Sequence, residues 1–366
     1  MSALKFKAEH PMFQYRLEEV PPDLTEWISS FERLLVLGFG GSVLPLRIFV
    51  ESAGLGEKII CWDRLSRPPF FAQKTLYCVV SKSGETLEVK ALLRDLLPDL
   101  GPDNLLCVTD PERGALREWQ TQNSFRSLPI PQEIGGRFTH FSVFHRALLE
   151  SQGISMSALL DRAKKKRDAL MKDSSELEEI ADIFFKPQAP PCFALWAYGA
   201  AHEAFAAWAQ QALAESLGKK DSAGRRYGKL PFLLKGPQDQ HSVLQYLVDG
   251  PQNQGLWLMA PKPEVEPPWE SSSKIPKFLQ TLSGQSLSKI EWILAESTYR
   301  SFLESNESGD THSPLLRWSF SRSLEEMTEK IVVIQAFVEA MGQSWGIDAF
   351  NQPGVERGKG IARKLL

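Results

Sequence analysis

A six-residue segment with three hydroxyl side chains offers the clearest binding chemistry in the sequence. The segment SKSGET, residues 81–86, follows an apolar, strand-like run and opens a helical pattern. Free backbone N–H groups and the helix dipole favour an anion at such a helix start, and hydroxyls complete a cup for phosphate. A capping box with Ser83 as the cap is the alternative, although one cap accounts for only one hydroxyl of the three. The pattern therefore favours a phosphate site.

A glycine-rich turn earlier in the chain has similar chemistry. The segment GFGGS, residues 38–42, also follows an apolar run. Its glycines let the backbone approach a ligand closely, and Ser42 can donate to a ligand or cap the next helix. A tight connection without a ligand is the alternative, because the dinucleotide-binding fingerprint is incomplete here. Parallel α/β sheets bind ligands beyond the carboxyl ends of their strands, which is where both turns would lie.

Apolar runs that alternate with helical patterns predict the elements that position these turns. In the first half, the expected strands are Arg33–Gly38, Leu76–Ser81 and Asn104–Asp110, and the expected helices are Ser42–Ala53, Glu85–Leu97 and Glu112–Gln120. A Pro-rich stretch, Phe185–Cys192, is a predicted hinge. Strand–helix alternation of this kind predicts a parallel sheet that is covered on both faces.

The alternation resumes after the hinge. The expected strands are Cys192–Tyr198, Pro231–Leu234, Gly255–Ala260 and Leu316–Phe320, and the expected helices are Ala200–Leu217, Gln240–Val248, Lys277–Leu303, Leu324–Met341 and Gly354–Leu366. We therefore predict an α/β fold of two tandem three-layer αβα sandwich domains with mainly parallel sheets. Residues 1–30 would form a lead-in, residues 31–185 the first domain, and residues 186–366 the second domain with a C-terminal helix.

Length, charge and cysteine content limit the possible classes. A chain of 366 residues suits two domains, and a net charge of −3 provides no basic field for nucleic acid. No run is long enough for a membrane span, and the first ten residues lack an apolar signal core. The four cysteines and the histidines lack metal-ligand spacing. We expect a cytoplasmic protein without a metal site that binds a small anion locally.

Five segments, in order along the chain, resemble a known family. The strand followed by Ser-x-Ser-Gly-x-Thr resembles the sugar isomerase domain, which binds phosphosugars. The further segments are GGRF at residues 135–138, QALAESLGK at residues 211–219, GPQDQHS at residues 236–242 and QPGVERGK at residues 352–359. Together they resemble glucose-6-phosphate isomerases, and the likeness extends from residue 38 to residue 359.

The resemblance implies an aldose–ketose isomerase that interconverts glucose 6-phosphate and fructose 6-phosphate through an enediol(ate), in glycolysis or gluconeogenesis. It implies no cofactor, and a homodimer in which a histidine is lent across the interface. The implied catalytic residues are Glu215 as the base, Arg137 beside the enediolate, and His241 and Lys359 in ring opening. The implied substrate-binding residues are Gly41, Ser42, Ser81, Lys82, Ser83, Thr86, Gly136, Gln211 and Gln352.

The side-chain types suit these roles. A carboxylate in the apolar setting of Ala-Leu-Ala-Glu-Ser can act as a fixed base for a C–H proton, although a lone helical glutamate is more often a surface residue. The permanently charged fork of Arg137 suits developing negative charge, with a structural ion pair as the alternative. A histidine such as His241 suits proton exchange with a ring oxygen, and a structural histidine is its alternative. Lys359 lies on a helix where lysines are usually solvated.

Two other functions stay open at the level of the sequence. A non-catalytic phosphosugar-binding regulator would keep the hydroxyl-rich turn but could lose Glu215, Arg137 or His241, and all three are present. An isomerase of broadened specificity, acting also on mannose 6-phosphate, is motivated by the Ser-Gly-Glu-Thr loop, which differs from the Thr-rich version typical of the family. His140 and His145 also depart from the family pattern.

Overall fold

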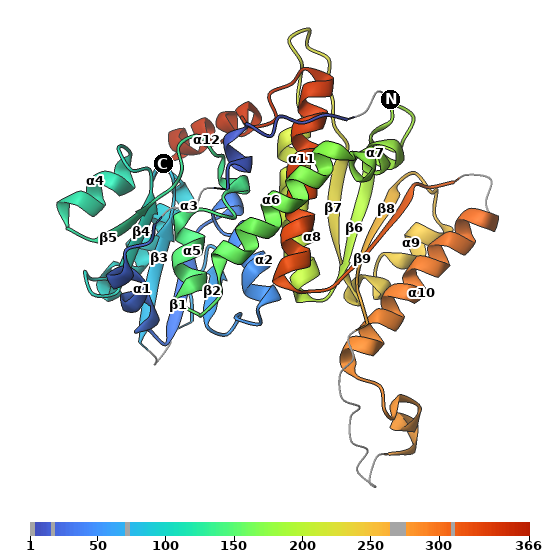
Figure 1. Ribbon diagram of the computed structural model, residues 1–366, viewed down its shortest axis with the longest axis horizontal. Coiled ribbons are helices and arrows are strands. Elements are labelled where there is room, and N and C mark those ends of the chain that lie inside the picture. Colours follow the sequence, from blue (N-terminus) through green and yellow to red (C-terminus); the bar gives the residue numbers. More distant parts are fainter. Residues whose placement is uncertain (1–3, 16–18, 70–73, 264–275, 309–311) are drawn as a thin grey trace.

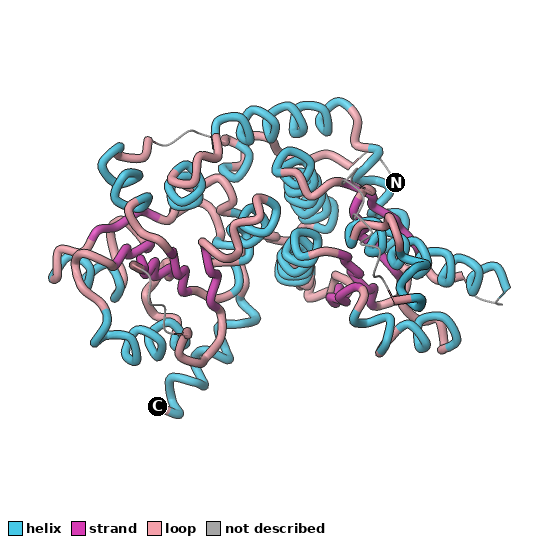
Figure 2. The backbone as a smooth tube through the Cα atoms, turned by 90° about the horizontal axis from the view of Figure 1, so that it is seen from below, coloured by secondary structure: helices cyan, strands magenta, loops and turns pink. Residues whose placement is uncertain are grey.

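The computed structural model describes residues 4–15, 19–69, 74–263, 276–308 and 312–366. Two parallel β-sheets, each covered by helices, lie on opposite sides of a central group of helices (Figure 1, Figure 2). The first sheet has the strand order β2-β1-β3-β4-β5. Its strands are β1 (Arg33–Leu37), β2 (Ile59–Trp62), β3 (Thr75–Val80), β4 (Leu105–Thr109) and β5 (Arg126–Pro129).

The second sheet has the order β7-β6-β8-β9, and every strand pair in both sheets is parallel. Its strands are β6 (Cys192–Tyr198), β7 (Leu230–Gly236), β8 (Gly255–Pro261) and β9 (Leu315–Phe320). Strands that are buried on both faces read as continuous apolar runs, and all five residues of β4 are buried. The predicted fold class of two tandem αβα sandwiches is confirmed.

Each expected helix has a counterpart in the same order, although the ends differ. The helices are α1 (Pro22–Ser29), α2 (Leu44–Ser52), α3 (Leu87–Leu96), α4 (Ala115–Gln122), α5 (Val143–Glu150), α6 (Met156–Lys172), α7 (Ser175–Ile180), α8 (Ala200–Leu217), α9 (Leu244–Asp249), α10 (Leu287–Ser308), α11 (Leu324–Trp345) and α12 (Pro353–Leu365). The described residues thus form four further helices, α1, α5, α6 and α7, that were not among the expected ones. Short 3₁₀ helices that matter for the site are η2 (Gly40–Ser42), η4 (Gly136–Phe138), η6 (Gln238–His241) and η7 (Lys277–Leu282).

Several predicted element boundaries were wrong for local reasons. The expected helix Lys277–Leu303 is two elements, η7 and α10, because the chain turns between them at Gly284, whose φ is +76°. The expected helix Gln240–Val248 is likewise divided into η6 and α9. The strands β2 and β5 were not predicted. Each has one buried residue in four and lies at an edge of the sheet, so neither forms a continuous apolar run.

Helix α8 lies in the centre of the molecule, between the two sheets. It packs against α2 from the first half of the chain and against α11 from the second half. Apolar side chains surround the helix, as expected for a helix that is buried on all sides. Helix α6 also packs against α11, so the two halves share one apolar core. The domain boundary at residue 185 stays a prediction.

The direction of α8 determines where a site can form. The helix starts at Gly199, beyond the carboxyl end of β6, and returns along the second sheet to its amino edge. There its last turns meet the carboxyl edge of the first sheet, because Gly40 lies against the side chain of Gln211. Among the described residues, no helix combines the length and the apolar character that a membrane span requires.

Candidate active site

Two backbone turns and helix α8 meet at the carboxyl edge of the first sheet. A Cβ atom on Gly41 would lie 2.5 Å from the backbone nitrogen of Arg137, so the turn after β1 and the turn at η4 touch backbone to backbone. A Cβ atom on Gly40, whose φ is +54°, would lie 3.0 Å from Gln211 Nε2. Only glycine permits both approaches. Five predicted site residues are therefore brought together: Gly41, Ser42, Gly136, Arg137 and Gln211.

The Arg137 side chain is held by four hydrogen-bond acceptors. Its Nε donates to Ser216 Oγ at 2.9 Å, and its Nη1 donates to Gln352 Oε1 at 3.3 Å. Its Nη2 donates to the carbonyls of Ala349, at 2.8 Å, and Asn351, at 3.3 Å. Burial, with only 3% of the side chain exposed, lowers the pKa of Arg137. Such a fixed, desolvated cation suits a site where negative charge develops.

Glu215 lies beside this arginine on the last turn of α8. Its Oε1 is 3.5 Å from Arg137 Nη1, and its Oε2 accepts a hydrogen bond of 2.9 Å from Gln211 Nε2, one turn earlier on the same helix. The carboxylate is 22% exposed, so one side of it remains open to a ligand. The buried Gln211 Oε1 has no hydrogen-bond partner among the described residues. Gln211 therefore fixes the carboxylate and keeps one acceptor unused.

The predicted phosphate turn folds around Ser81 and Gly84. Ser81 Oγ lies 3.2 Å from Thr86 Oγ1 and accepts from the backbone nitrogen of Gly84 at 3.1 Å. Ser83 Oγ accepts from the backbone nitrogen of Glu85 at 3.1 Å. Helix α3 begins after Thr86, whose side chain makes no capping bond. The capping-box alternative with Ser83 as the cap is therefore wrong, and the role of this turn as an anion cup stays a prediction.

Lys82 points toward another loop. Its Nζ donates to the carbonyl of Gln132 at 2.8 Å, and this contact ties the phosphate turn to the chain that leads into η4. Burial lowers the pKa of Lys82, while the nearby carboxylate of Asp110 opposes that shift. The contact with Gln132 joins two loops of the site. The predicted contact of Lys82 with substrate stays a prediction.

Helix α12 connects the arginine to the phosphate turn. Gln352 at its start contacts Arg137, and the helix then crosses above the carboxyl edge of the first sheet (Figure 1). Lys90 lowers the pKa of Glu85 in the phosphate turn, and Arg363 near the end of α12 lowers it further. Lys359 lies between these two ends, half-exposed, and pairs with Glu356 at 2.7 Å. Its predicted role in ring opening stays a prediction.

His241 lies at the other end of α8. It is exposed on η6, directly after the carboxyl end of β7. The carboxyl end of β7 lies beside the start of α8, because Lys235 Nζ of β7 is 3.9 Å from Glu203 Oε2 of α8. Glu203 and Glu215 are twelve residues apart on α8, which corresponds to about 18 Å of helix rise. The structure therefore does not bring His241 to the Glu215 of its own chain.

The two unusual histidines belong to the core. His145 Nδ1 lies 2.9 Å from Ser142 Oγ, and His140 Nδ1 lies 3.4 Å from Gln335 Nε2. Burial lowers the pKa of His145 to about 4 and lowers that of His140 well below its ordinary value. Both are neutral at physiological pH. They support the segment behind η4 and do not face Glu215.

Three contacts of Arg137 were not anticipated from the sequence. Ser216 follows the predicted base directly, so its place in the motif was an available signal. The carbonyls of Ala349 and Asn351 carried no such signal, because a backbone acceptor does not depend on residue type. Within the described residues, no three His, Cys, Asp or Glu side chains are arranged to hold a metal ion. The independence from metals and cofactors stays a prediction.

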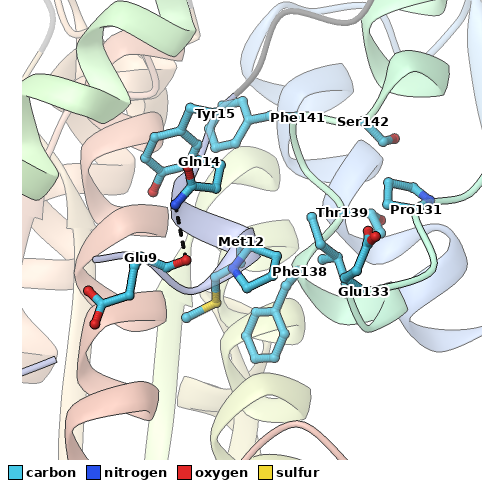
Figure 3. Close-up of a pocket in the computed structure, with 12 residues that line it drawn as sticks. Glu9, Met12, Gln14, Tyr15, Pro131, Glu133, Phe138, Thr139, Phe141 and Ser142 are labelled. Atoms are coloured by element: carbon cyan, nitrogen blue, oxygen red, sulfur yellow. Dashed lines mark hydrogen bonds between the residues drawn. The ribbon is translucent and has the colours of Figure 1, made fainter. Parts of the chain in front are cut away.

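A cavity of about 430 Å³ lies beside Phe138 and Thr139 (Figure 3). It separates the N-terminal segment around Met12 and Tyr15 from the loop that contains Phe138 and Thr139. Thr139 Oγ1 donates to the carbonyl of Gly136 at 2.8 Å, so the cavity wall is continuous with the site turn. None of the thirteen predicted site residues lines it. The cavity is therefore distinct from the candidate active site.

Curated relatives match the chain over nearly its whole length, although no family model matches it. A glucose-6-phosphate isomerase from Thermus thermophilus is 29% identical over 360 residues, which are 93% of this chain and 84% of the relative. A glucose-6-phosphate isomerase from Campylobacter jejuni is 27% identical over 364 residues, with 92% of this chain and 85% of the relative covered. The resemblance found in the sequence motifs is confirmed.

Solved structures agree with this. A hypothetical protein, also from Thermus thermophilus, superimposes with a TM-score of 0.80 at 26% identity, covering 94% of this chain and 86% of that one. A glucose-6-phosphate isomerase from Chlamydia trachomatis shares the fold, with a TM-score of 0.71 at 19% identity over 94% of this chain and 71% of that one. The fold is thus that of an α/β protein of the sugar isomerase type with two αβα sandwiches. Among such proteins, the chain is a relative of enzymes named glucose-6-phosphate isomerase.

Proposed function

We propose that this protein interconverts glucose 6-phosphate and fructose 6-phosphate. The observation that carries the proposal is the pair of Glu215 and Arg137, 3.5 Å apart, at the sheet edge that also holds the hydroxyl-rich turn. A base and a fixed cation side by side are the two groups that proton transfer through an enediolate requires. The names of the curated relatives support the same substrate pair.

In the proposed reaction, Glu215 removes the proton from C2 of the open-chain aldose. The electron pair of the broken C–H bond forms the C1–C2 double bond, and the carbonyl oxygen at C1 takes up the negative charge. Arg137 faces that charge with a guanidinium group that needs no reorganisation, because its hydrogen bonds to Ala349 and Gln352 already fix it. Glu215 then returns the proton to C1, while the C2 hydroxyl passes its proton to the oxygen at C1 and becomes the ketone.

The phosphate group of the substrate would bind at residues 81–86. Gly84 has a φ of +69°, and a Cβ atom there would lie 2.2 Å from the backbone nitrogen of Leu116, so the turn is shaped by glycine and packed against the start of α4. Ser83 is exposed and Thr86 is half-buried, which leaves both hydroxyls accessible. The backbone amides of the turn and the start of α3 add a favourable field for the anion.

A second copy of the chain would complete the site. Ring opening needs an acid and a base near the ring oxygen, and His241 can serve there only in the site of another molecule, because its own Glu215 lies at the opposite end of α8. We therefore propose a homodimer with shared active sites. Sugar phosphate is the proposed ligand, and the cytoplasm, with glycolysis or gluconeogenesis, is the proposed setting.

An exposed apolar segment, called the arm below, supports the proposed dimer. The segment η7, with the start of α10, extends away from the body of the molecule (Figure 1), and Phe278 and Leu287 are 78% and 88% exposed. Exposed apolar side chains of this size mark protein interfaces. Gln240 Nε2 donates to Thr298 Oγ1 of α10 at 2.8 Å, so the helix that carries the arm also supports the loop that carries His241. A partner that covers the arm would therefore lie against the same helix that contacts the loop of His241.

One assay tests the proposed activity. Purified protein is supplied with glucose 6-phosphate, and formation of fructose 6-phosphate is followed through a coupled reaction, with Glu215→Gln as the matched inactive variant. Turnover by the wild type alone is the expected result. Binding of glucose 6-phosphate without turnover would instead indicate a phosphosugar-binding regulator, and equal turnover of mannose 6-phosphate would indicate broadened specificity.

A further inference from the structure

We propose that Lys219 is a positioning residue for this reaction, acting through Asn351 on Arg137. The proposal rests on the proposed function, since it concerns the same cation. Lys219 follows the end of α8, four residues after Glu215. Its Nζ donates both to the backbone carbonyl of Asn351 and, at 2.8 Å, to Asn351 Oδ1. Lys219 thus joins the helix that carries the base to the segment that holds the arginine.

Asn351 is the shared point of contact. Its backbone carbonyl accepts hydrogen bonds from Lys219 Nζ and from Arg137 Nη2, the latter at 3.3 Å. Two cations from different parts of the chain therefore meet at one carbonyl oxygen. Its neighbour Gln352 contacts Arg137 Nη1 at 3.3 Å, and the Ala349 carbonyl accepts from Nη2. Any shift of the segment that contains these three residues therefore changes three of the four acceptors that orient the guanidinium.

Asp348 also holds Asn351 in place through hydrogen bonds. Asp348 Oδ1 accepts from the backbone nitrogens of Phe350, at 2.9 Å, and Asn351, at 3.3 Å, and its Oδ2 accepts from Asn351 Nδ2 at 2.7 Å. The connection between α11 and α12 has no helix or strand of its own to keep it in place. The carboxylate of Asp348 within the segment and Lys219, which follows the end of α8, hold it in place instead.

The charges around Lys219 agree with this role. Burial lowers the pKa of Lys219 and the nearby Arg137 lowers it further, while the carboxylates of Asp348 and Glu215 oppose the shift. Two cations and two carboxylates thus lie close enough to influence one another electrostatically. Both Lys219 contacts go to Asn351, and this engagement makes Lys219 a support of the site rather than a ligand of the phosphate.

Lys219→Met, which keeps most of the length of the side chain and removes its donors, tests the inference. We expect kcat to fall about 10- to 100-fold, because a displacement of about 1 Å in a catalytic group can cost that much. KM for glucose 6-phosphate should change less than about threefold, since the phosphate turn lies on another element. Lys219→Arg should restore part of kcat. Lys220→Met, at the exposed neighbouring position, is the matched control and should behave as wild type.

A double-mutant cycle separates positioning from a general loss of stability. If Lys219 acts through Asn351, Lys219→Met combined with Asn351→Ala should lower kcat little more than either change alone. Additive losses, or a lowered melting temperature with unchanged kcat, would overturn the inference. Should either variant fail to fold, Lys219→Arg and Lys219→Gln provide the same comparison with smaller changes of shape.

Binding measurements distinguish a failed inference from a failed function. Titration calorimetry with 5-phosphoarabinonate, whose carboxylate carries charge where the enediolate would, should show weaker binding to Lys219→Met than to wild type. Inorganic phosphate, which needs only the turn at residues 81–86, should bind both proteins equally. A wild type that binds the mimic but does not turn over glucose 6-phosphate would refute the function alone. Equal affinity of both proteins for the mimic would refute the role of Lys219.

Discussion

The carboxylate of Glu215 illustrates how neighbouring residues decide the role of a single side chain. A glutamate on a helix is ordinarily a surface residue, but here Gln211 holds one oxygen at 2.9 Å and Arg137 lies 3.5 Å from the other. Both partners come from elements that glycines bring into contact at the edge of the first sheet. The carboxylate is therefore fixed in orientation and open on one side, which is the state a base needs before substrate arrives.

Glu215→Gln should abolish proton transfer while leaving the shape of the site unchanged. The amide fits the same space but cannot accept the C2 proton, so we expect kcat/KM to fall about a hundredfold or more with either cyclic or open-chain substrate. Exchange of deuterium from solvent into C2 of the substrate, followed by NMR, measures the step directly. Exchange at the wild-type rate in this variant would show that another group is the base.

Two buried histidines should make the fold sensitive to acid. Burial lowers the pKa of His145 and of His202 to about 4, below the ordinary value of 6.5. Between these two values the unfolded chain binds more protons than the folded one, so stability is complete above pH 6.5 and is lost as the pH falls toward 4. Each histidine should contribute a slope of about 1.4 kcal/mol per pH unit to the free energy of unfolding in that window.

Urea unfolding at several pH values should show this dependence of the free energy of unfolding on pH. His202→Gln should make the slope shallower, and an unchanged slope would contradict the assignment.

At the scale of elements, the sequence predicted what depends on local pattern. The strands β1, β3, β4, β6 and β8 are apolar runs followed by turn residues, and their positions were anticipated. Contacts between residues that are far apart in the sequence were not anticipated. The carbonyls that hold Arg137 are backbone atoms, and Lys82 and Lys219 found loop partners that no spacing rule indicates. The residue types determine which functional groups are available. The packing of α8 between the two sheets determines which of these groups come into contact.

The contact between the turns at η2 and η4 should tolerate no side chain. A Cβ atom at Gly41 would lie 2.5 Å from the backbone nitrogen of Arg137, and both groups are backbone that cannot move aside. We expect Gly41→Ala to separate the turns, reduce kcat/KM by about a hundredfold and lower the melting temperature. Gly101→Ala, where a Cβ atom would meet nothing within 4 Å, is the matched control. Wild-type activity in Gly41→Ala would show that the turns need not touch.

At the scale of the whole molecule, the residues proposed for one reaction lie near opposite ends of α8. His241 is on the carboxyl edge of the second sheet, whereas Glu215 and Arg137 face the carboxyl edge of the first. The proposed two-fold dimer would resolve this, since each chain would then give its His241 to its partner and receive one in return. The exposed arm around Phe278 adjoins α10, the helix that contacts Gln240 in the loop of His241, and it offers an apolar surface for such a partner.

Mixing two inactive variants tests the shared site quantitatively. Glu215→Gln and His241→Ala proteins, mixed in equal amounts and allowed to exchange subunits, should form mixed dimers as half of all dimers. Each mixed dimer contains one intact site, made of Glu215 from one chain and His241 from the other, so we expect about a quarter of the wild-type activity. If each chain used its own His241, no recovery would follow. The complementary control mixes wild type with the double variant Glu215→Gln/His241→Ala: shared sites predict that activity falls to about a quarter of that of an equal total amount of wild type, whereas independent sites predict about half.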